Sequence, residues 1–245
     1  DAGPDDTSSG CGPRNVVVVL LDSLNRHMVG AYAPVLAQAP EFDTPNLDRF
    51  AARAVRFDRH HTGSLPCMPA RHDILVGALD FLWRPWGSVE IWEDAVTYDL
   101  RRAGVTTMLV SDHPHLFEAG GENYHTDFGA WRYVRGHEGD PWRTAADPSW
   151  IGTPALPARE GWIPHAYDES RTWFRSEEDF PGARTMAEAA RWLADEAPSA
   201  ERMLIRLVDV VVVRQRGDMD QPLGRKHDAL TEEAVVLHPG DHRFV

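Results

Sequence analysis

An unbroken run of apolar, mostly β-branched side chains, Asn-Val-Val-Val-Val-Leu-Leu, occupies residues 15–21 and ends at Asp22. A run without polar alternation is typical of a parallel strand that is covered on both faces. A second such run, Thr106–Val110, follows a helical pattern at Ile91–Ala103. Strand, helix and strand in this order predict a right-handed βαβ unit. The fold class is therefore expected to be α/β, with a mostly parallel sheet flanked by helices.

Polar side chains follow both predicted strands. Asp22 comes directly after the first strand, and His113 and His115 follow the second. Open α/β sheets bind ligands outside the carboxyl ends of their strands, so these side chains are expected at one edge of the sheet, together with Cys67. Asp22 is a candidate metal ligand there. Its alternative role is a cap on a helix at residues 24–29, and the residues alone leave both roles open.

A cysteine, Cys67, lies in the stretch Gly-Ser-Leu-Pro-Cys-Met-Pro-Ala-Arg, at the start of a predicted helix that runs through Val76. Pro69 favours a helix start, because its missing N–H would be unpaired there anyway. A group in the first turn meets backbone N–H donors and the positive end of the helix dipole, which suits an anion or a nucleophile that attacks one. Arg71, four residues on, is expected on the same face, where its guanidinium can clamp a tetrahedral oxyanion. The alternative is that Cys67 is a small buried apolar residue.

The segment Cys-Met-Pro-Ala-Arg, residues 67–71, resembles the Cys-x-Pro-x-Arg signature of the type I sulfatases, in the alkaline phosphatase superfamily. Thr44–Ala51 also resembles a family segment, Thr-Pro-Asn-Leu-Asp, with Thr44 as a helix N-cap. The resemblance implies that a formylglycine-generating enzyme converts Cys67 to formylglycine. The hydrate of that aldehyde would attack the sulfur of a small sulfate ester, or the phosphorus of an ester in some relatives. Arg71 would support the modified residue and the metal site. The predicted function is that of a sulfatase-like hydrolase.

Two departures from the family pattern leave details open. Asp22 matches the first metal-binding Asp of the family, but Ser23 replaces the second. Phosphonate and phosphodiester hydrolases of the superfamily also lack that second Asp. The divalent metal (Ca²⁺ or Mn²⁺/Zn²⁺) and the choice between sulfate and phosphate or phosphonate esters therefore stay open. The Lys of the family's Gly-Lys-Trp-His segment has no counterpart, and His113 or His115 is expected to replace it as a general acid or anion donor.

A late apolar run, Glu233–Leu237, precedes Asp241 and His242. Sulfatases carry an Asp-His or Asp-Asn pair of metal ligands after such a strand. The resemblance therefore implies a metal site of four groups: Asp22, the formylglycine derived from Cys67, Asp241 and His242. Oxygen and nitrogen ligands of this kind suit a hard or borderline divalent ion. The alternative is a chance pair near a frayed terminus.

The likeness to the family covers roughly residues 15–202 and then stops, because family members continue into an Asp-Pro-His-x-Pro type of loop that is missing here. A helix is predicted at Thr185–Ala197 and a strand at Met203–Val208. The chain is accordingly divided into three parts: a disordered tail at 1–14, a sulfatase-like α/β domain at 15–208, and an atypical segment at 209–245 of a truncated or frame-altered chain. The alternative functions are a catalytically inactive fragment and an enzyme that uses an unmodified Cys67 thiolate.

Charge and cysteine content narrow the choice of partners. A net charge of -13 disfavours nucleic-acid binding, which needs clustered positive charge. A local pocket of arginine, histidine and metal can still bind an anionic ester. No apolar run reaches the ~18 residues of a membrane span and no signal-peptide core is present, so no membrane association is expected and the predicted location is cytoplasmic. Cys11 lies in the polar tail, which disfavours a Cys11–Cys67 disulfide.

Overall fold

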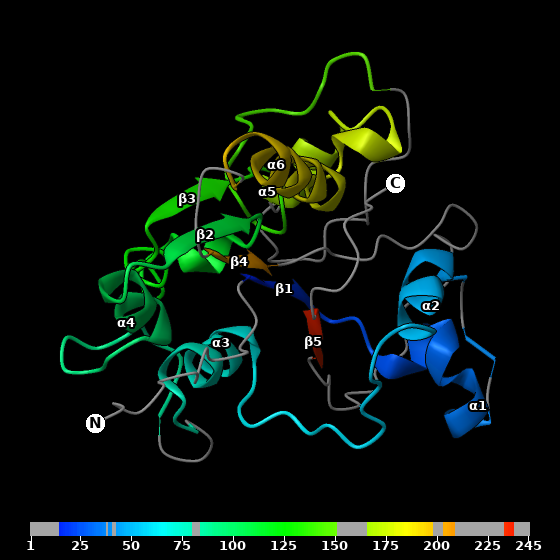
Figure 1. Ribbon diagram of the computed structural model, residues 1–245. Coiled ribbons are helices and arrows are strands. Elements are labelled where there is room, and N and C mark those ends of the chain that lie inside the picture. The colour runs from blue at the N-terminus through cyan, green and yellow to red at the C-terminus, as the bar shows by residue number, and fades with distance from the viewer. Residues whose placement is uncertain are drawn as a thin grey trace, which may run out of the picture.

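The computed structural model describes residues 15–37, 39–40, 43–79, 84–150, 166–197, 203–208 and 233–237. Its centre is a five-stranded sheet with the order β3-β2-β4-β1-β5 (Figure 1). The strands are β1 (Asn15–Leu21), β2 (Thr106–Ser111), β3 (Ala130–Tyr133), β4 (Met203–Val208) and β5 (Glu233–Leu237).

Four of the strands are parallel, which confirms the predicted mostly parallel sheet. β1 and β2 belong to the same sheet, and β4 lies between them as the partner of both. The register pairs Leu20 with Val208 and Val208 with Ser111, so the carboxyl ends of all three strands meet at one edge. The segments that begin at Asp22 and Asp112 therefore leave the sheet at the same edge, on either side of β4.

Helices cover both faces of the sheet (Figure 1). On one side lie α3 (Cys67–Val76) and α4 (Val96–Arg102), and on the other lie α5 (Ala166–Arg171) and α6 (Pro181–Asp195). Alternate residues of β2 face the two layers: Leu109 packs with Met68 and Leu75 of α3, whereas Met108 and Val110 pack with residues of α6. This two-sided burial is the reason that the strand reads as a continuous apolar run.

The chain after β1 forms a separate helical group, with η1 (Arg26–Met28), η2 (Gly30–Tyr32), α1 (Ala33–Leu36) and α2 (Pro45–Ala51). The helix expected at 24–29 is a short 3-10 turn, and its cap is Asn25, whose side chain accepts a hydrogen bond from the His27 amide at 2.9 Å. Thr44 occupies the position before α2, but its hydroxyl accepts from the Gly30 amide at 2.9 Å instead of capping the helix.

Two predicted helices differ from the observed ones at their starts. The helix expected from Ile91 begins only at Val96, because Ile91 and Trp92 are 98% and 75% exposed and do not face the core. The helix expected from Thr185 begins earlier, at Pro181, which occupies a first-turn position where its missing N–H costs nothing. Gly104 follows α4 with a φ of 77°, as expected for a helix-ending glycine.

The predicted late strand is present as β5, and it pairs antiparallel with β1. Leu237, its last residue, lies opposite Val17 near the beginning of β1, whereas Glu233 lies opposite Leu21. The chain thus leaves β5 at the edge of the sheet opposite to Asp22. Asp241 and His242 lie outside the described residues, so their metal role stays a prediction.

The remaining short elements are η3 (Pro114–Leu116) and η4 (Glu177–Asp179). Within the parts of the chain that the structure describes, no helix has the length and apolar character needed to span a bilayer. The predicted tail at 1–14 and most of the segment at 209–245 lie outside those parts, and the predicted domain limits stay predictions.

Candidate active site

Cys67 is the first residue of α3 and is partly buried. The helix runs, as predicted, through Val76 and ends at Gly77, whose φ is 75°. Just before the helix, the Ser64 hydroxyl donates to Asp73 at 2.9 Å, which ties the approaching loop to the second turn. The helix start places the Cys67 side chain beside the residues that follow β2: its sulfur and one ring nitrogen each of His113 and His115 lie within 4.8 Å of one another.

Arg71 is fully buried and links two parts of the site. One nitrogen of its guanidinium donates to the Cys67 carbonyl at 2.9 Å, and another donates to the Asp22 carboxylate at 3.0 Å. The sequence suggested two roles for this side chain, as a clamp on an oxyanion or as a support for the nucleophile and the metal site. The observed contacts are those of a support, because they hold the backbone of Cys67 and the carboxylate in fixed positions.

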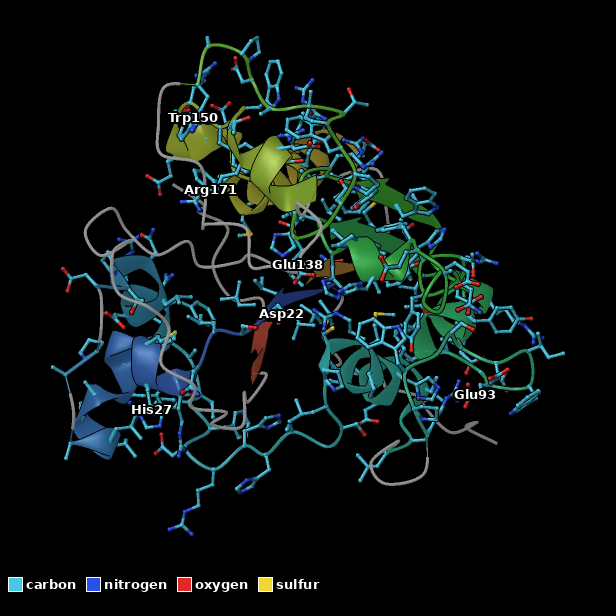
Figure 2. All side chains as sticks on the ribbon, turned by 180° about the vertical axis from the view of Figure 1, so that it is seen from behind. Asp22, His27, Glu93, Glu138, Trp150 and Arg171 are labelled. Carbon is cyan, nitrogen blue, oxygen red and sulfur yellow. The ribbon has the colours of Figure 1, made fainter. Side chains whose placement is uncertain are left out.

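Asp22 leaves the end of β1 and points into the site (Figure 2). Its second carboxylate oxygen accepts a hydrogen bond from the Ser23 hydroxyl at 2.9 Å. Ser23 has a φ of 59°, a left-handed conformation that costs a non-glycine residue free energy. The Nδ1 atom of His113 lies 4.0 Å from the carboxylate. The strained turn after β1 thus aims Asp22 at the segment that follows β2.

His113 and His115 have opposite electrostatic environments. His113 is fully buried, and this burial, reinforced by the positive charge of Arg71, holds its pKa well below the usual value of 6.5. His115 is partly exposed and lies between two carboxylates: its Nε2 is 3.1 Å from Glu138, and its Nδ1 contacts Glu118. The hydrogen bond with Glu138 raises the pKa of His115 above 6.5 in spite of partial burial. His113 is therefore a neutral imidazole near neutral pH, and His115 is the better proton donor.

Glu138 also belongs to the site, although no feature of the sequence assigned it a role. Its carboxylate binds His115 and lies 3.6 Å from His137, and these contacts lower the pKa of Glu138. Its φ of 46° is again a left-handed conformation. Glu138 follows β3, which ends at the same edge as β2, and Figure 2 places it near Asp22. Recognition of the four-residue strand β3 in the sequence would have predicted this position.

The residues around Asp22 fit a hard divalent cation of the kind that the resemblance implies. Each oxygen of the carboxylate accepts one hydrogen bond, and a carboxylate has about four lone-pair sites, so both oxygens keep the capacity to bind a cation. Conversion of Cys67 to an aldehyde hydrate would add oxygen ligands at residue 67, whose carbonyl bonds the same guanidinium as Asp22. Oxygen donors suit Ca²⁺, Mg²⁺ or Mn²⁺. Within the described residues, Asp22 and residue 67 are the ligands that this fit supports.

Comparison with known proteins decides the family. The profile of the Sulfatase family matches residues 14–150, more than half of the 245-residue chain. The chain belongs to the sulfatase family. The match includes the end of β1, all of α3, the histidines after β2 and Glu138, so every described residue of the site belongs to the sulfatase region.

Individual relatives of this sulfatase chain are more distant. Arylsulfatase G of Mus musculus is 28% identical over 158 residues, which are 60% of this chain and 29% of that protein. N-acetylgalactosamine-6-sulfatase of Rattus norvegicus is 34% identical over 67 residues, 27% of this chain and 12% of that protein. This chain spans less than a third of the length of these curated relatives.

A solved structure supports the fold of this chain. The phosphonate monoester hydrolase of Agrobacterium radiobacter superposes with a TM-score of 0.50 over 81% of this chain and 41% of that one. The two sequences are 18% identical, so the likeness establishes a shared fold and carries no statement about the substrate.

Proposed function

We propose that this chain hydrolyses small sulfate esters with formylglycine at position 67 as the nucleophile and a divalent metal bound by Asp22. The observation that carries the proposal is the convergence of a helix-start cysteine, a buried arginine and two histidines at one edge of the sheet. Arg71 bonds both the Cys67 carbonyl and Asp22, so one side chain sets the distance between the nucleophile and the metal ligand.

In the proposed mechanism, Cys67 must first be converted by a formylglycine-generating enzyme. An oxygen of the aldehyde hydrate then attacks the ester sulfur, and the bond from sulfur to the alcohol oxygen breaks. The second hydroxyl of the hydrate loses its proton to solvent and expels the sulfate as the aldehyde re-forms, and water adds to the aldehyde to restore the hydrate. When bound, the metal neutralises charge on the ester oxygens. The buried guanidinium of Arg71 keeps residue 67 and Asp22 oriented throughout, at no cost in reorganisation during the reaction.

The leaving alcohol needs a proton, and the sequence left His113 and His115 as candidates for its donor. We assign this role to His115, because the two flanking carboxylates favour its protonated form, whereas burial keeps His113 neutral. His113, next to Asp22, is assigned to the ester oxygens as a neutral hydrogen-bond donor. A general acid of this kind contributes about 10²–10⁴-fold to a rate, most for alcohols that leave poorly.

A second candidate is hydrolysis of phosphonate or phosphate diesters by the same residues. Ser23 favours it, since relatives of that kind share the missing second Asp. In this structure the Ser23 hydroxyl donates to the Asp22 carboxylate. An aspartate at position 23 would instead repel the Asp22 carboxylate, and it would attract the metal more strongly than serine does. Parallel assays with 4-nitrophenyl sulfate and a 4-nitrophenyl phosphonate separate the two candidates by their ratio of kcat/KM.

The test of the proposed function is the variant Cys67→Ala, with Cys11→Ala as the matched control. Turnover of both esters is expected to vanish in Cys67→Ala and to persist in Cys11→Ala, while both variants keep the circular dichroism spectrum of the parent. Near-normal turnover in Cys67→Ala would overturn the mechanism. A converted chain that binds the metal and shows no turnover would favour the alternative of an inactive fragment.

A further inference from the structure

The same cysteine has a different chemistry before it is converted. We propose that the chain whose Cys67 is still a thiol binds one Zn²⁺ through Cys67, His113 and His115. The three side chains offer one sulfur and two nitrogens, and these are the ligand types that zinc prefers, unlike the oxygen ligands expected after conversion. The zinc site and the proposed hydrolase site share all three residues, and they exclude one another because the zinc site needs the thiol that conversion removes.

The geometry is close to that of a zinc centre with three protein ligands. Bonds of about 2.3 Å to sulfur and about 2.0 Å to nitrogen place tetrahedral ligand atoms about 3.3–3.6 Å apart. The three ligand atoms here lie within 4.8 Å of one another, so closure needs movements of about 1 Å. His113 is fully buried and fixed, whereas the side chain of His115 is 27% exposed. His115 can therefore move towards the ion, and solvent can fill the fourth position.

Each histidine of the proposed site has a carboxylate beside it. Asp22 lies 4.0 Å from a nitrogen of His113, and Glu138 lies 3.1 Å from a nitrogen of His115. Zinc-binding histidines commonly contact a carboxylate through the ring nitrogen that does not bind the metal, which orients the ring and strengthens the ligand. His115 also contacts Glu118, whose side chain is half exposed, so zinc can replace one of the two contacts while the other is kept.

The charges around the three ligands favour a divalent cation. Glu118, Glu138 and Asp22 contribute carboxylates, and Arg71, the guanidinium of this cluster, is paired with Asp22. Zinc binding releases the thiol proton of Cys67 to solvent, and the resulting thiolate bonds the ion. A thiolate held in this way is shielded from alkylation and from conversion to the aldehyde. After conversion the sulfur is gone, and the preference for zinc goes with it.

The test uses the full 245-residue chain with an unconverted thiol, verified by its intact mass. Titration with Co²⁺, the spectroscopic substitute for zinc, is expected to give a sulfur-to-cobalt charge-transfer absorption that saturates at one ion per chain and disappears when Zn²⁺ is added. Cys67→Ser removes this absorption, whereas the control Cys11→Ser keeps it. His115→Ala weakens zinc binding by at least ~10-fold, while the control His27→Ala, an exposed residue of η1, leaves it unchanged.

A second measurement needs no variant. Zinc is expected to slow the reaction of Cys67 with iodoacetamide by at least ~10-fold and to leave the reaction of Cys11 unchanged, as read from the masses of the two peptides. The proposal is overturned if cobalt gives no sulfur charge-transfer absorption, if the absorption survives Cys67→Ser or is lost in Cys11→Ser, or if zinc does not protect Cys67. None of these readings needs turnover, so their failure leaves the proposed hydrolase intact, and a failure of the hydrolase leaves them unaffected.

Discussion

Arg71 and His72 are neighbours in the sequence of α3, both are fully buried, and they belong to two different clusters. Arg71 bonds Asp22 and the Cys67 carbonyl at the edge of the sheet. His72 bonds Glu93 at 2.9 Å, and Glu93 also binds Arg84 at 2.5 Å. Figure 2 shows Glu93 well away from Asp22.

The difference between the two clusters lies in what surrounds the paired charges. Around Glu93, the His72 ring, the Arg84 guanidinium and the Glu90 amide use the carboxylate oxygens, and the cluster joins α3 to the loop before α4. Around Asp22, the neighbours include a thiol and two histidines, which carry reactive chemistry. Burial of charge therefore does not by itself mark an active site. The chemical types that converge on the pair distinguish a reactive site from a structural brace.

The largest expected effect comes from changing the reactive cluster. Arg71→Lys keeps the charge but loses the planar fork that reaches Cys67 and Asp22 at once. In the converted enzyme, kcat/KM is expected to fall about 100-fold, at the upper end of the range for groups that orient metal ligands. Glu93→Gln is the control from the other cluster, and its kcat/KM per folded molecule is expected to stay within ~2-fold of the parent. An equal loss in both variants would remove the distinction between the clusters.

The second prediction concerns stability. Glu93→Gln replaces the carboxylate that contacts both His72 and Arg84 with a neutral amide. The side chains of His72 and Arg84 are buried or nearly buried, and each is left with a weaker hydrogen-bond partner. The free energy of unfolding is expected to fall by about 2 kcal/mol, below the range for fully buried pairs because the Glu93 side chain is 12% exposed. Urea denaturation measures this change. An unchanged urea midpoint would mean that the Glu93 cluster does not stabilise the folded state.

The third prediction concerns how the stability that the Glu93 cluster contributes depends on pH. Burial acts to raise the pKa of Glu93, but hydrogen bonds from His72, the Glu90 amide and Arg84 outweigh it, and the pKa lies below the ordinary 4.5. A carboxyl group with a lowered pKa in the folded state stabilises the protein above pH 4.5 and loses this contribution as the pH falls through the folded value. The stability difference between the parent and Glu93→Gln should therefore shrink on acidification below that pH. A difference that stays constant down to pH 3 would contradict this assignment.

The smallest expected effect is at the end of α3, which both clusters share. A Cβ added at Gly77 meets no atom within 4 Å, so Gly77→Ala costs only the strain of a φ of 75°. The free energy of unfolding should fall by about 1 kcal/mol, and kcat/KM should not change. Gly121→Ala is the contrast, since its Cβ would collide with the backbone of His115, and it should reduce turnover as well as stability.

The sequence predicted the elements that have an unambiguous pattern. The buried strands β1 and β2 have continuous apolar runs, and α3 has its proline and closing glycine, so Asp22, Cys67 and the two histidines could be assigned to one edge. The short strand β3 has only four residues, which alternate weakly, and Glu138 was missed with it. The insertion of β4 between β1 and β2 depends on pairing between distant segments. No local pattern encodes that order.

If residue 67 works as formylglycine, the peptide that contains it must carry the modification, and its mass shows this without any assay of turnover. The peptide should be isolated from protein made in its native host, with the Cys11 peptide as an internal control for general oxidation. We expect the mass loss of a thiol-to-aldehyde conversion at residue 67 and an unchanged thiol at residue 11. An unmodified thiol at residue 67 in every molecule would contradict it.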